Sequence, residues 1–116
     1  MTAYNHLKFK QLDIYWVNLE PTVGHETQKQ RPCVIIQNDL VNQNSKTLII
    51  APLLKKHKSW PFAVNISPSA INNLDQDRHI NLKQLRSVDI SRLINKNGSL
   101  EIHYLLEIKN SLNVIF

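Results

Sequence analysis

The fold is decided by the stretch DIYWVNLEPTVGHETQKQRPCVII, residues 13–36. Residues 13–19 are rich in β-branched and aromatic side chains, which predicts a strand. Residues 33–36 form an apolar run that predicts a second, buried strand, and Pro32 fits only as its first residue. Residues 22–30 show no apolar periodicity and predict a loop. Strands are usually joined by about 2–5 residues, so a loop of this length is more often functional than idle.

Further strands are predicted downstream of this pair. They cover residues 47–54, residues 60–66 and, as one strand or a strand pair, residues 78–88. The loop before the last of these has room for one helical turn over 69–74. Pro52 has no amide hydrogen to donate within a sheet, so it predicts an edge or bulged strand at that point.

The final stretch has apolar residues at spacings of three and four, which predicts one amphipathic helix. These residues are Leu105, Ile108, Leu112 and Ile115. Ser99 is the expected cap of this helix, and Glu101 is expected in its first turn. Short strands followed by one helix predict a mainly β (α+β) fold, a small antiparallel sheet or barrel with the helix packed on it.

Length and composition limit the class of protein. A chain of 116 residues suits one domain, residues 1–116. Apolar runs such as 48–51 are far shorter than the ~20 residues that cross a bilayer. The first eight residues contain no apolar stretch of signal-peptide length. We therefore expect a cytoplasmic protein that makes no contact with membranes.

Charge favours an anionic partner. The chain carries 14 Lys and Arg against 9 Asp and Glu, a net charge of +5, and such a surface attracts polyanions. Many small basic proteins nevertheless bind no nucleic acid. Cys33 is the sole cysteine, lies in a predicted buried strand and is expected to belong to the core. The sequence has no CxxC pair and no HExxH pattern, so no metal or other cofactor is predicted.

The predicted loop carries the residues with the most chemistry. His25 and Glu26 are followed five residues after Glu26 by Arg31. Cleavage of RNA by its own 2′-hydroxyl needs one group to take the 2′ proton, one to protonate the leaving 5′ oxygen, and a cation at phosphorus. A guanidinium suits the phosphate because its planar fork donates two hydrogen bonds at once. The alternative is a polar surface loop in which Arg31 only pairs with Glu26 or Glu20.

Residues 13–36 resemble the opening of the MazF/PemK (Kid) toxins, in which a Gly-Asp strand and a Pro-x-x-Gly-x-Glu loop precede Arg-Pro and an apolar strand. The likeness continues through Pro52, Pro61-Phe62 and Gln84-Leu-Arg-Ser-Val-Asp-Ile-Ser-Arg-Leu93 into the final helix. It implies an SH3-like barrel of the MazF/PemK/CcdB type that forms a homodimer.

The same resemblance implies a function. Such a toxin of a type II toxin–antitoxin system is a metal-independent endoribonuclease, an mRNA interferase that cuts single-stranded RNA at selected sequences by 2′-hydroxyl attack. Its partner is a cognate antitoxin of the MazE/PemI type, which inhibits the toxin through a short acidic C-terminal segment. The complex with the antitoxin is expected to bind DNA.

Carried over residue by residue, the family's loop glutamate corresponds to Glu26 and its catalytic arginine to Arg31. Leu54 stands where the family usually has a Thr or Ser that contacts the scissile phosphate, and an aliphatic side chain cannot make that hydrogen bond. Lys55 is a possible substitute, as a positive charge at the same phosphate. Lys83 replaces a residue that is acidic in many relatives, and Leu12 replaces the initial glycine.

The sequence also indicates residues for RNA binding. They are Lys29, Lys55, Lys56, Gln84 and Arg86, and for Gln84 and Arg86 a role as solvated strand ends is equally compatible. The run of positive charge from Lys55 to Lys58 suits a phosphate-tracking loop or a merely solvated surface. Trp16 and Trp60 either stack on bases or pack in the core or a dimer interface.

A rival function comes from another class. The same barrel also carries CcdB-like toxins that trap a topoisomerase, and the loss of a hydroxyl at Leu54 suits a protein that only binds. The alternatives are therefore an inactive or weak barrel that inhibits a topoisomerase, or an RNA-binding module that does not cleave.

Overall fold

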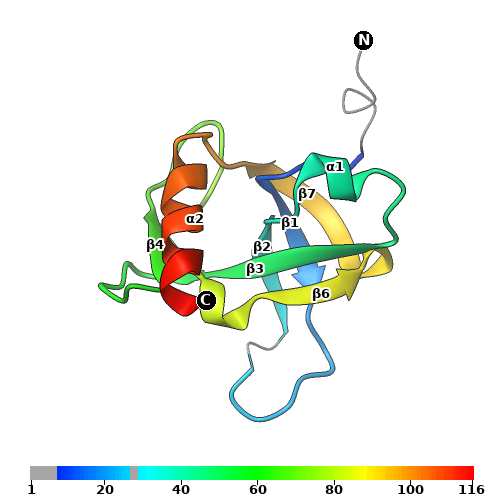
Figure 1. Ribbon diagram of the computed structural model, residues 1–116, viewed down its shortest axis with the longest axis horizontal. Helices are drawn as coiled ribbons and strands as arrows, with labels where there is room; N and C mark the ends of the chain where they lie inside the picture. The colour runs from blue at the N-terminus through cyan, green and yellow to red at the C-terminus, as the bar shows by residue number, and fades with distance from the viewer. Residues whose placement is uncertain (1–7, 27–28) are drawn as a thin grey trace.

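The computed structural model of the protein describes residues 8–26 and 29–116 (Figure 1). The strands are β1 (Asp13–Asn18), β2 (Gln30–Ile35), β3 (Thr47–Lys55), β4 (Ala63–Ile66), β5 (Arg78–Asn81), β6 (Arg86–Asp89) and β7 (Leu93–Ser99). The helices are α1 (Asp39–Asn42) and α2 (Tyr104–Ile115), with 3-10 turns η2 (Leu82–Gln84) and η3 (Ile90–Arg92). A mainly antiparallel sheet with a C-terminal helix confirms the predicted fold class.

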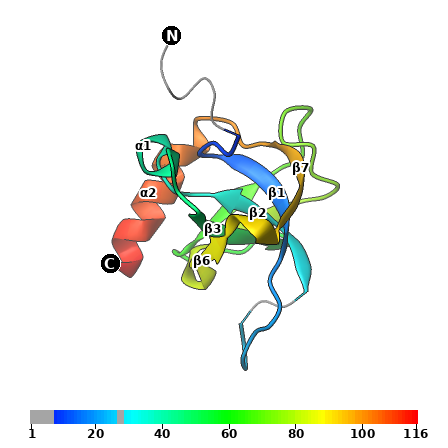
Figure 2. The ribbon, with the colours of Figure 1, turned by 90° about the vertical axis from the view of Figure 1, so that its right-hand side faces the viewer.

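Strand β3 is the hub of the sheet. The strand order is β4-β5-β3-β2-β1-β7, and β6 also pairs with β3. Strands β6 and β5 pair with successive parts of β3, up to Ile50 and from Leu53 onwards, because η2 interrupts the chain between them. Figures 1 and 2 show the strands curving around a common interior, with α2 beside β4 at one end.

The core consists of two clusters on opposite faces of the sheet. One cluster lies between the sheet and α2, where Ile108 is 1% exposed and Leu105, Leu112 and Ile115 pack against it. The helix therefore buries the face that its apolar spacing predicted. The other cluster covers the opposite face and consists of Tyr15, Val17, Leu19, Cys33, Ile35, Leu48, Ile50 and Val88.

Pro32 and Pro52 lie at strand positions where the sheet requires no amide hydrogen. Pro32 is the third residue of β2, opposite Trp16, rather than its first residue as predicted. The pairing of β2 with β3 begins only at Cys33. No carbonyl of β3 therefore loses a hydrogen-bond donor because of Pro32. Pro52 does not make β3 an edge strand. It lies in the gap between the β6 and β5 partners, where β3 is unpaired on one side.

The predictions for the segment before α2 were wrong. Ser99 was expected to cap the helix, but it is the last residue of β7, and the helix starts at Tyr104 after His103, which makes no side-chain cap. Glu101 precedes the helix and accepts a hydrogen bond from Asn72 Nδ2 at 3.2 Å. Strand β7 itself was not predicted, because it lacks apolar alternation and is instead held by pairing with β1.

Gly98 allows β7 to lie close to the loop before β5. A Cβ atom at this position would lie 2.5 Å from the carbonyl oxygen of Asn72 and 2.7 Å from that of Ile71, both backbone atoms. We expect Gly98→Ala to lower the free energy of unfolding by about 2–3 kcal/mol through this overpacking. Urea denaturation followed by circular dichroism measures the loss.

Gly24→Ala is the matched control. Gly24 has φ +59° with nothing within 4 Å of an added Cβ, so only the left-handed backbone penalty of about 1 kcal/mol applies. Equal losses in the two variants would contradict the close approach at Gly98.

Candidate functional site

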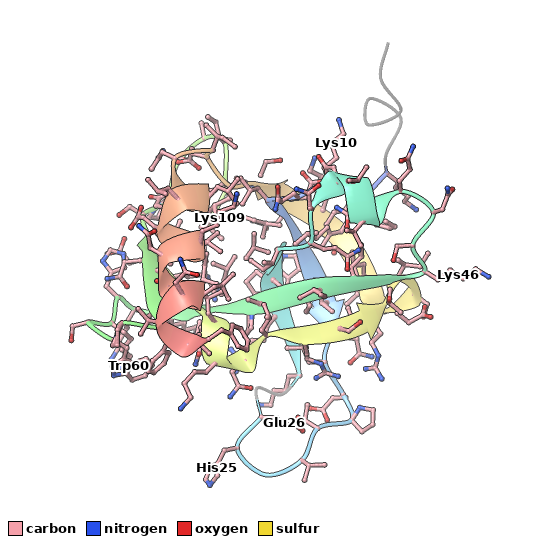
Figure 3. The ribbon with its side chains drawn as sticks, in the orientation of Figure 1. Lys10, His25, Glu26, Lys46, Trp60 and Lys109 are labelled. Atoms are coloured by element: carbon pink, nitrogen blue, oxygen red, sulfur yellow. The ribbon has the colours of Figure 1, made fainter. Side chains whose placement is uncertain are left out.

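Glu26 organises residues 23–26 of the β1–β2 loop. The Glu26 amide donates to the Val23 carbonyl at 3.2 Å, and Glu26 Oε1 accepts from the Val23 amide at 2.5 Å. Gly24, in the left-handed region at φ +59°, completes the turn. His25 and Glu26 are both exposed, and Figure 3 shows His25 pointing outward while Glu26 turns back across the loop.

The neck of the loop is closed by hydrogen bonds between its two sides. The Leu19 amide donates to the Lys29 carbonyl at 3.0 Å, and the Lys29 amide donates to Glu20 Oε1 at 2.8 Å. Glu20 is therefore engaged with backbone. Lys29 is exposed and adopts a left-handed φ of 69°. The loop leaves the sheet at a defined point, directly beside Arg31.

Arg31 and Arg86 lie on one face of the sheet, around Cys33. Arg31 is half-buried on β2, two residues before Cys33, so the two side chains share a face. Arg86 lies opposite Ile50 and donates from Nη1 to the Leu19 carbonyl at 3.1 Å. Burial raises the pKa of the Cys33 thiol to about 12, and the positive charges of Arg86 and Arg31 act in the opposite direction. Both cations therefore belong to the Cys33 face, and Arg86 reaches the base of the loop at Leu19.

Arg92 strengthens the same region and was missed by the sequence analysis. From η3, Arg92 Nη1 donates to the Asn18 carbonyl at 3.2 Å and also to the Glu20 carbonyl. Together with Arg86, it binds consecutive carbonyls at the point where β1 ends. The available signal was its place in the segment Gln84–Leu93, which carries the family resemblance, but the motif alone does not say what the side chain touches.

Leu54 belongs to the face of Arg31. Pro52 lies opposite Cys33 across β2 and β3, and alternation along β3 places Leu54 on the same side as Pro52. Leu54 is half-buried and lies opposite His79 of β5. The structure thus puts an aliphatic group on this face, beside a buried imidazole.

His79 is 2% exposed and its ring orientation is fixed. Its Nδ1 donates a hydrogen bond to the Lys56 carbonyl at 2.7 Å. The other ring nitrogen, Nε2, is buried and has no hydrogen-bond partner among the residues that the structure describes. The sequence analysis assigned this residue no role.

The remaining predicted site residues come from several parts of the fold. Lys55 ends β3 and Lys56 follows it with φ 71°, and both side chains are exposed. Gln84 is half-buried in η2. Trp16 is partly buried and donates from Nε1 to Asn97 Oδ1 at 3.2 Å, which agrees with its alternative role in packing.

The arrangement suits chemistry on a phosphodiester. An exposed carboxylate and an exposed imidazole lie on a loop beside two guanidinium groups that share one face of the sheet, and the latter can neutralise charge that builds on phosphorus. Within residues 8–26 and 29–116, no group of three or more His, Cys, Asp or Glu side chains is placed to hold a metal ion. No helix in the described part of the chain is long and apolar enough to span a membrane.

Comparisons with known proteins agree on one family. Residues 10–116 match the family model described as PemK-like, MazF-like toxin of type II toxin-antitoxin system. The endoribonuclease MazF of Staphylococcus epidermidis is 37% identical over 105 residues, 88% of this chain and 86% of the relative. The endoribonuclease EndoA of Bacillus subtilis is 29% identical over 106 residues, 90% of this chain and 91% of the relative.

Solved structures show the same fold. A crystal structure of MazF from Deinococcus radiodurans has a TM-score of 0.76 at 21% identity, over 91% of this chain and 94% of that one. An endoribonuclease in complex with its cognate antitoxin from a mycobacterial species has a TM-score of 0.73 at 16% identity, over 90% and 91% of the two chains.

Proposed function

Because this chain belongs to the family of PemK-like, MazF-like toxins of type II toxin–antitoxin systems, we propose that it is a metal-independent endoribonuclease that cuts single-stranded RNA at selected sequences. The family resemblance inferred from residues 13–36 is thereby confirmed, and the curated relatives are named endoribonucleases. The observation that carries the proposal is that Arg31 and Arg86 share the Cys33 face of the sheet, beside a loop that exposes His25 and Glu26.

The reaction divides into three tasks. The 2′-oxygen attacks phosphorus, the bond from phosphorus to the 5′-oxygen breaks, and the products end in a 2′,3′-cyclic phosphate and a free 5′-hydroxyl. Glu26 and His25 share the two proton transfers, one as base at the 2′-hydroxyl and the other as acid at the 5′-oxygen. Arg31 donates to the phosphoryl oxygens as charge develops on them. Arg92 acts as a positioning residue, because it holds the backbone at the neck of the loop, and Arg86 combines the same task with contact to the RNA.

The substrate strand is bound by exposed cations. Lys29 stands at the neck of the loop, and Lys55 and Lys56 continue from Leu54 beyond the end of β3. We assign these lysines to RNA phosphates, and Gln84 and Arg86 to contacts with bases or phosphates. Lys55 alternates with Leu54 along β3, so its charge lies on the opposite face of the strand and does not replace the hydrogen bond missing at Leu54.

One experiment tests the proposal directly. Purified protein incubated with a long RNA in EDTA should yield discrete fragments, because no step requires a metal. We expect Arg31→Ala to retain the fold and to cleave about 10²–10³ times more slowly, the usual cost of removing one charge-stabilising donor. Single-turnover rates and thermal melts on the same samples measure both properties.

Lys109→Ala is the control, because Lys109 is exposed on α2. Cleavage by Arg31→Ala at the parental rate would refute the role of Arg31. RNA left intact by the parental protein would instead favour the second candidate function, a toxin that binds and inhibits a target such as a topoisomerase. The aliphatic side chain of Leu54 on the Arg31 face favours that candidate.

Leu54→Thr tests the position of the phosphate. If Arg31 holds the phosphate beside Leu54, a hydroxyl there adds one hydrogen bond to a charged oxygen, worth about 1.5–3 kcal/mol. Cleavage should then accelerate about 10- to 100-fold. A lowered melting temperature without any gain in single-turnover rate would show that Leu54 lies away from the phosphate.

The protein's partner class follows from its family, since toxins of this kind are paired with an antitoxin. We propose that the toxin is a homodimer in the cytoplasm and that an acidic, partly disordered antitoxin segment inhibits it, because disordered segments wrap basic surfaces. Light scattering at micromolar concentration should give twice the 13.5 kDa chain mass. Titration with the acidic C-terminal peptide encoded by the neighbouring short reading frame should stop cleavage. A monomer, or cleavage unaffected by saturating peptide, would contradict this part of the proposal.

A further inference from the structure

A stacked pair of aromatic rings, exposed at Trp60 and half-buried at Phe62, lies between β3 and β4. Trp60 is 41% exposed, and its ring stacks on that of Phe62 with centroids 5.2 Å apart and planes 21° from parallel. Figure 3 shows Trp60 at the outer edge of the molecule. Large aromatic rings usually bury their apolar area in a core. An aromatic face that stays in contact with solvent therefore indicates a binding surface.

Neighbouring residues hold this stack in place. The backbone of Lys58 is fixed by Asn65, whose Oδ1 accepts from the Lys58 amide at 2.9 Å and whose Nδ2 donates to the Lys58 carbonyl at 3.0 Å. The His79 ring meets Trp60 edge-on, with centroids 5.7 Å apart and planes at 90°. Because the Lys56 carbonyl orients the buried His79 ring, the Trp60 ring is supported from beneath. A ligand therefore meets a surface that needs little further ordering.

The stack is surrounded by positive charge. Lys58 Nζ lies 5.2 Å from the centroid of Trp60, and Lys83 Nζ lies 5.2 Å from the centroid of Phe62. Exposed aromatic faces alternating with lysines are the surface that single-stranded nucleic acid uses, since bases stack on the rings and phosphates pair with the cations.

We propose that Trp60 and Phe62, flanked by Lys58 and Lys83, form a subsite that stacks one unpaired base of the RNA substrate outside the cleavage site. The proposal rests on the proposed function, because it extends the path of the same RNA. Its location supports this, since His79 touches Trp60 and lies opposite Leu54, which faces the side of Arg31. Phe62 covers one face of Trp60, so the base occupies the other face and displaces the Lys58 ammonium towards a phosphate.

A binding measurement tests this subsite. The probe is a fluorescent single-stranded RNA that spans a cleavage site mapped with the parental protein, with a 2′-deoxy nucleotide at the cut so that it stays intact. We expect Trp60→Ala to raise Kd about 5- to 150-fold, the range for loss of one stacked base. Trp60→Phe should restore most of the affinity because it keeps an aromatic face. Fluorescence anisotropy gives Kd for each variant.

An abasic scan of the same RNA identifies the stacked base. Removing one base at a time from the probe should weaken binding to the parental protein at one position outside the cut. At that position Trp60→Ala should bind the intact and the abasic RNA equally well, which is the signature of a direct contact. Lys58→Gln and Lys83→Gln test the two flanking charges in the same assay. Lys46→Gln, which removes an exposed charge at the other end of β3, is their control for a general loss of charge.

The outcomes separate the two proposals. A parental protein that neither cuts nor binds RNA overturns the proposed function and the subsite together. A protein that cuts RNA, and whose Trp60→Ala variant keeps the parental Kd or shows the same abasic profile, overturns the subsite alone. Conversion of Trp60→Ala to a monomer, in light scattering, would assign the stack to an interface between subunits and also overturn the subsite.

Discussion

The architecture depends on the hydrogen-bonding capacity of a single strand. Strand β3 pairs with β2 along one edge and with both β6 and β5 along the other edge. The turn η2 separates β5 from β6 in the chain. Pro52 makes this possible, because a residue without an amide hydrogen can occupy the gap between two partners. Both arginines of the cleavage site are positioned relative to that strand. Arg31 comes from the partner on one side, and Arg86 comes from a partner on the other.

The charges of the site also have a structural task. Where β1 leaves the sheet, the carbonyls of Asn18, Leu19 and Glu20 accept hydrogen bonds from arginine side chains. Backbone acceptors in a folded protein need partners, and a guanidinium offers several donors in a rigid plane. Arg86 and Arg92 therefore stabilise the fold at the same place where positive charge serves a phosphate. Removing either one is expected to alter the loop and the electrostatics together.

The sequence predicted those elements whose patterns are local. Residues 13–18 and 47–55 are strands because of their β-branched and apolar content, and the apolar spacing of α2 marked the face that it buries. Strand β7 escaped prediction because its sequence, LINKNGS, has no alternation and its pairing with β1 contains two register shifts. Glu26 and Arg31 were reached first from the chemistry of the residues in their loop and then through a family motif. The contacts of Arg92 with carbonyls more than seventy positions away, and the place of His79 opposite Leu54, arise only from the tertiary pairing of strands.

The hydrogen bonds from Arg92 to the neck of the loop have a consequence for the synthesis of the protein. The Asn18 carbonyl accepts a hydrogen bond from Arg92, 74 residues later in the chain. The outer partner of β1 is β7, which comes later still. Contacts of such long range form only after the intervening chain is available. A nascent polypeptide that has emerged as far as the loop thus possesses Glu26 and Arg31 without the arginine that fixes the backbone beside them. Most of the chain must therefore be synthesised before the backbone beside Glu26 and Arg31 can become ordered.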